Sequence, residues 1–136
     1  MLGYPEQALA DASEALRDAR EIGHAASLMY ALLHSTMFAQ IPCGNYLVAK
    51  RQLDELVDLA GEKSASIWRA GGIFAQGWLF ALTGKAAEAI QFINSGLSMW
   101  QATGATAWCS LLMSYLAIAF AQVGRFEDAR RCIDQR

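Results

Sequence analysis

The stretch Gly84-Lys85-Ala86-Ala87-Glu88-Ala89 decides the fold, because its glycine and its last alanine recur at the same spacing along the chain. The recurring glycines are separated by steps of 41, 40 and 40 residues, and they are Gly3, Gly44, Gly84 and Gly124. The alanines that follow them by five residues are Ala8, Ala49, Ala89 and Ala129. A fixed period of this length is typical of a protein built from repeats of one supersecondary unit.

Each glycine predicts the end of one helix and the turn into the next, because glycine adopts left-handed backbone conformations easily. The alanine after it allows two helix backbones to approach closely. A further residue, nine positions after each glycine, lies one helical turn beyond the alanine on the same face; these residues are Ala12, Leu53, Ile93 and Ile133. Gly23, Gly61 and Gly104 are predicted to end the alternate helices.

Apolar periodicity between these turns predicts seven helices and no strands. The helices are expected at about 5–22, 25–40, 46–60, 64–83, 86–102, 105–123 and 126–135. The predicted fold class is all-α, a stack of antiparallel helix pairs. We expect one domain over 1–136, with units at about 1–23 (a half unit), 24–61, 62–104 and 105–136. Because both ends fall on the second helix of a pair, we expect the chain to be part of a longer protein.

The third unit resembles the tetratricopeptide repeat in the order and spacing of its residues, which are Gly77, Phe80, Gly84, Ala89 and Ile93. The fourth unit shows the same pattern with Ala117, Phe120, Gly124, Ala129 and Ile133. The second unit is degenerate, with Met37, Gln40, Gly44, Ala49 and Leu53. The resemblance implies a right-handed solenoid that binds other proteins. The long step is similar to that of helical repeats in bacterial multidomain regulators and class III nucleotide cyclases.

The resemblance also implies which residues line the inner curve of the stack and bind a partner. They are His34, Phe38, Phe74, Trp78, Tyr115, Ile118 and Gln122, with Trp78 as the strongest single candidate. The helices that carry them are nearly free of charge, which indicates that much of their surface is covered. A second interpretation remains open, since aromatic residues at helical spacing are often core residues.

Composition argues against several classes of partner and site. The net charge of -2, with both signs mixed along the chain, leaves no basic surface for nucleic acid. Two long stretches lack charged residues, but polar side chains and glycines interrupt them, so a buried helix is expected rather than a membrane span. Three widely spaced cysteines fit neither a disulfide framework nor a zinc motif, and they favour a reducing, cytoplasmic location.

No arrangement of residues in the sequence indicates catalysis, a metal site or a cofactor. His24 and His34 are ten residues apart, and the nearest cysteine, Cys43, adds no ligand spacing of the kind zinc sites show. Ser110 and Ser114 lie in a charge-free helix with no histidine near them in the sequence to activate a hydroxyl. The sequence therefore predicts a protein-interaction or scaffold module, such as the regulatory region of a larger bacterial signalling protein. The partner could also be a second copy of the chain, which would form a homodimer through the apolar groove or the unpaired end helices. The alternative is a binder of a small apolar ligand or lipid.

Overall fold

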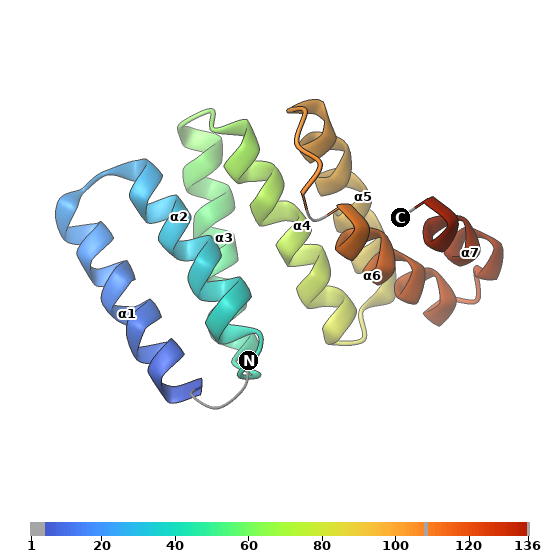
Figure 1. Cartoon of the computed structure of the whole chain (residues 1–136), viewed down its shortest axis with the longest axis horizontal. Helices are drawn as coiled ribbons and strands as arrows, with labels where there is room; N and C mark the ends of the chain where they lie inside the picture. The colour runs from blue at the N-terminus through green and yellow to red at the C-terminus, as the bar shows by residue number, and fades with distance from the viewer. Residues whose placement is uncertain (1–4, 108, 136) are drawn as a thin grey trace. The chain divides into compact units, whose positions relative to one another are not determined.

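The structure is a computed structural model that describes residues 5–107 and 109–135 (Figure 1). Gly3, the first glycine of the repeat, lies outside these residues. The described segments contain seven α-helices, one π-helix and no strand, which confirms the all-α prediction. The elements are α1 (Pro5–Ile22), α2 (Ala25–Ser35), η1 (Thr36–Gln40), α3 (Tyr46–Glu62), α4 (Ser66–Leu82), α5 (Ala86–Ala102), α6 (Cys109–Gln122) and α7 (Phe126–Gln135).

The turns between the helices recur with a regular spacing that is visible in the backbone angles. The residues with positive φ are Gly23, Gly44, Ser64, Gly84, Gly104 and Gly124. Successive members are 20 residues apart, except for the 21 residues from Gly23 to Gly44. The prediction that Gly61 ends a helix is wrong: α3 continues to Glu62, and Ser64 adopts the left-handed conformation with φ 52°.

The π-helix η1 accounts for the one extra residue between Gly23 and Gly44. The backbone N–H of Ile41 donates to the carbonyl of Thr36, five residues earlier, at 3.0 Å, so this turn holds one residue more than an α-helical turn. The buried hydroxyl of Ser35 donates to Oε1 of Gln52 at 2.9 Å, and the hydroxyl of Thr36 donates to the backbone carbonyl of Leu32 at 2.8 Å. The extra residue in the 41-residue step is therefore accommodated by a local widening of one helix into a π-helical turn.

Helix α6 begins later than the sequence predicted. Residues 105–107 are not helical, and α6 starts at Cys109 instead of at 105. The indole N–H of Trp100 in α5 donates to the backbone carbonyl of Ala107 in this segment at 2.8 Å.

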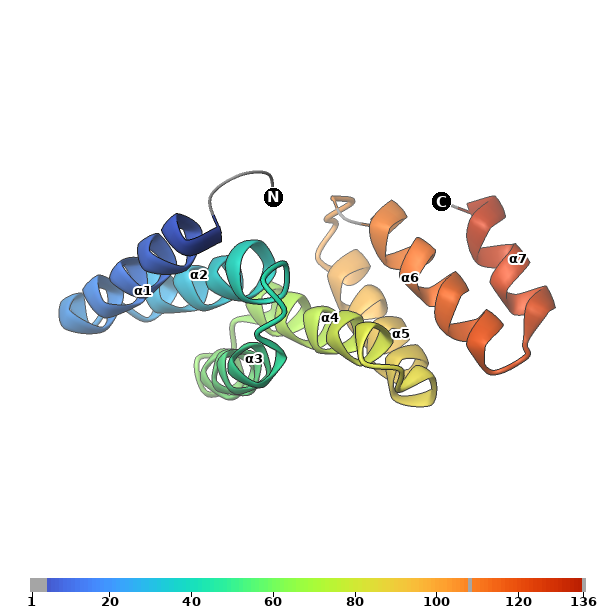
Figure 2. The same ribbon diagram turned by 90° about the horizontal axis from the view of Figure 1, so that it is seen from below.

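The chain divides into two compact units at Gly72 and Ile73, within the continuous helix α4. In the first unit α1 packs on α2 and α2 on α3, around the fully buried Leu32, Leu53 and Leu56. In the second unit α5 packs on α6 and α6 on α7 (Figure 2), and Phe74 and Ile93 belong to the core. The predicted boundaries of the four repeat units stay a prediction.

Among the described helices, none is both long and apolar enough to span a bilayer.

Candidate functional site

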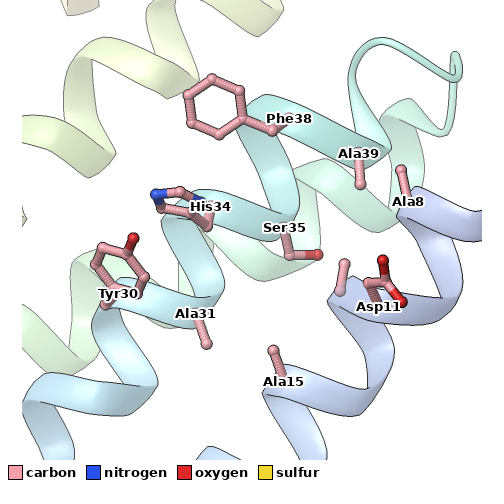
Figure 3. Close-up of a pocket in the computed structure, with 10 residues that line it drawn as sticks. Ala8, Asp11, Ala15, Tyr30, Ala31, His34, Ser35, Phe38 and Ala39 are labelled. Carbon is pink, nitrogen blue, oxygen red and sulfur yellow. The ribbon is translucent and has the colours of Figure 1, made fainter. Parts of the chain in front are cut away.

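A concave surface, a groove, lies between α1 and α2 in the first unit (Figure 3). It consists of two adjoining pockets of about 270 and 420 Å³ that share Ala15, Tyr30 and Ala31. We call this surface the α1–α2 groove. Every lining residue belongs to α1, α2 or η1, so within the described chain no third helix contributes to it.

Small side chains form the two facing walls of the groove. The lining residues of α1 include Ala8, Ala12, Ala15 and Ala19, whose spacing of three or four residues places them on one helix face. From the other side, Ala31, Ser35 and Ala39 point toward α1 in Figure 3. Such a surface leaves room for the large side chains of another helix.

A row of aromatic rings forms one edge of the groove. Tyr30 stacks on His34 with ring centroids 4.2 Å apart, and His34 contacts Phe38 at 4.9 Å. These three residues, which we call the aromatic row, are four residues apart and therefore follow one face of α2 and η1. Tyr30 is 52% exposed and Phe38 is 46% exposed. The row is thus a large apolar surface in contact with solvent.

The face of α5 that is equivalent to the groove face of α1 is covered by α4. By the repeat, Ile93 and Gly96 of α5 correspond to Ala12 and Ala15 of α1. Ile93 is fully buried beside Gly77 of α4, where an added Cβ would lie 2.6 Å from Ile93 Cγ1.

The same helix covers Gly96. A Cβ added at Gly96 would lie 2.6 Å from the backbone nitrogen of Phe74 in α4. Ala15, in contrast, is exposed to solvent in the groove.

The structure places the predicted inner-curve residues in different environments. His34 and Phe38 lie together at the groove. Phe74 is only 2% exposed and packs edge-on against Trp100 at 5.4 Å, so its prediction as a partner-binding surface residue is corrected: it is a core residue. A partner cannot reach it without unfolding the second unit.

The remaining predicted residues lie in the second unit. Trp78 is half-buried and its ring lies 5.4 Å from that of Tyr115. Its indole nitrogen is buried and has no hydrogen-bond acceptor among the described residues. Ile118 is 49% exposed and Gln122 is exposed. These contacts establish Trp78 and Tyr115 as neighbours.

Sequence reasoning missed Tyr30 and the alanine face of α1. The signals were present: Tyr30, His34 and Phe38 are spaced by four residues, and alanines recur at helical spacing from Ala8 to Ala19.

The ionisable groups show little that would support catalysis. A hydrogen bond from Arg20 lowers the pKa of Glu55 and raises that of Arg20, and the pair joins α1 to α3 at 2.7 Å. Burial, with the nearby Asp128 carboxylate, raises the pKa of the Cys132 thiol, which keeps it protonated. In the described segments, no three His, Cys, Asp or Glu side chains gather as metal ligands do.

Comparison with known proteins gives no match: no family model, no curated protein and no solved structure matches the chain. The function is therefore argued from the groove itself.

Proposed function

We propose that this protein is a protein-interaction module that binds an α-helix of a partner protein in the α1–α2 groove. The observation that supports this proposal most strongly is the comparison of α1 with α5. The face of α5 that packs against α4 corresponds in α1 to a face with Ala12 and Ala15, of which Ala12 is half-buried and Ala15 is exposed. As part of the same proposal, the chain is a helical repeat of the tetratricopeptide type, acting as a scaffold or regulatory region.

The sizes of the lining residues define the helix that fits. Ala12 is smaller than Ile93, so the bound helix needs a bulky apolar side chain where α4 has Gly77. Ala15 is larger than Gly96, so the bound backbone lies farther away than Phe74 lies from Gly96. Large side chains inserted between two small-residue walls are the common form of helix recognition in a groove.

The test uses a synthetic peptide with the sequence of Ser66–Leu82 in which leucine replaces Gly77, labelled for fluorescence anisotropy. Ala15→Trp fills the groove where its two pockets meet, and we expect it to weaken peptide binding at least tenfold. Ala87→Trp, on an exposed position of α5, is the matched control and should leave binding unchanged. Equal binding by all three proteins would contradict the proposal.

Light scattering on a size-exclusion column separates the partner protein from a second copy of the chain. A monomer at all concentrations supports the proposal. A dimer that Ala15→Trp dissociates would show that a second copy occupies the groove and would overturn the assignment to a partner protein.

The alternative, a small apolar ligand or lipid, has less support. The pockets of the groove, about 270 and 420 Å³, reach only the lower part of the size range of ligand sites, and both are open to solvent. A ligand that copurifies with the wild-type protein but not with Ala15→Trp, seen by native mass spectrometry, would favour it.

A further inference from the structure

We draw no further inference here: the strongest candidate, the cavity of about 290 Å³ in the second unit where Cys132 of α7 occupies the repeat position of Phe92, is rimmed by exposed polar side chains of α5 and α7, and nothing in the described residues shows which ligand would fill it.

Discussion

Helices α1 and α5 occupy equivalent places in the repeat, yet one presents an open face and the other a covered face. In α5, Ile93 is fully buried and Gly96 allows the backbone of α4 to approach. In α1 the corresponding residues are Ala12 and Ala15, and Ala15 is exposed. The difference shows that equivalent helix positions are buried or exposed depending on whether a neighbouring helix covers them.

The side chains match this difference in role. The covered face combines the large Ile93 with Gly77 of α4, so that one helix fills the space that the other leaves. Small residues predominate on both sides of the open face, and the large rings lie at its edge. A core needs complementary sizes from both helices.

The largest expected effect on stability comes from shortening a side chain on the covered face of α5. Ile93→Ala should lower the free energy of unfolding by about 3 kcal/mol, because it creates a cavity beside Gly77. The opposite change at the equivalent open position, Ala12→Ile, should alter stability by less than about 0.5 kcal/mol. Urea denaturation followed by circular dichroism measures both, and similar losses in the two variants would break the comparison.

The close approach at Gly96 gives the next effect. Gly96→Ala should destabilise the protein by about 2 kcal/mol, since the new Cβ would overlap the backbone of Phe74. Gly61→Ala is the control, because the nearest neighbouring atom would be 4.0 Å away, and the gain in helix propensity should stabilise it by about 0.5 kcal/mol. Thermal unfolding of both variants tests this difference in sign.

The comparison of α1 with α5 relies on the regular spacing of the left-handed turn residues, and Ser64 allows a test of this turn geometry. This residue adopts the left-handed conformation that glycines adopt at the other turns, so Ser64→Gly should stabilise the protein by about 1 kcal/mol. The reverse change, Gly84→Ser, should destabilise it by a similar amount. A loss of stability in Ser64→Gly would contradict the assigned turn geometry.

The smallest effect concerns the ion pair that holds α1 beside α3. Glu55→Gln should cost about 0.5 kcal/mol at pH 7, because both partners are largely exposed. The lowered pKa of Glu55 means that the pair stabilises the fold above the ordinary glutamate range. Its contribution is lost as the pH falls from the ordinary glutamate range through the lowered pKa of Glu55. Denaturation at pH 7 and pH 3 should therefore show a larger difference between wild type and variant at pH 7.

The candidate site was only partly predictable from the sequence. His34 and Phe38 were identified, and the structure brings them together; Phe74 was assigned to a binding surface but is buried. Periodicity places a residue on a helix face, but it does not reveal which helix packs against that face. The late start of α6 was also not predicted from the apolar periodicity.

By itself, the sequence determined the seven helices, their turns and their repeat, because these depend on local properties: apolar periodicity, helix propensity and the left-handed turn residues. The tertiary structure decided which equivalent faces are covered and which are open. It also decided that the residue added between Gly23 and Gly44 widens a turn into a π-helix. Exposure and close packing depend on atoms contributed by other helices, and those contacts form only when the chain has folded.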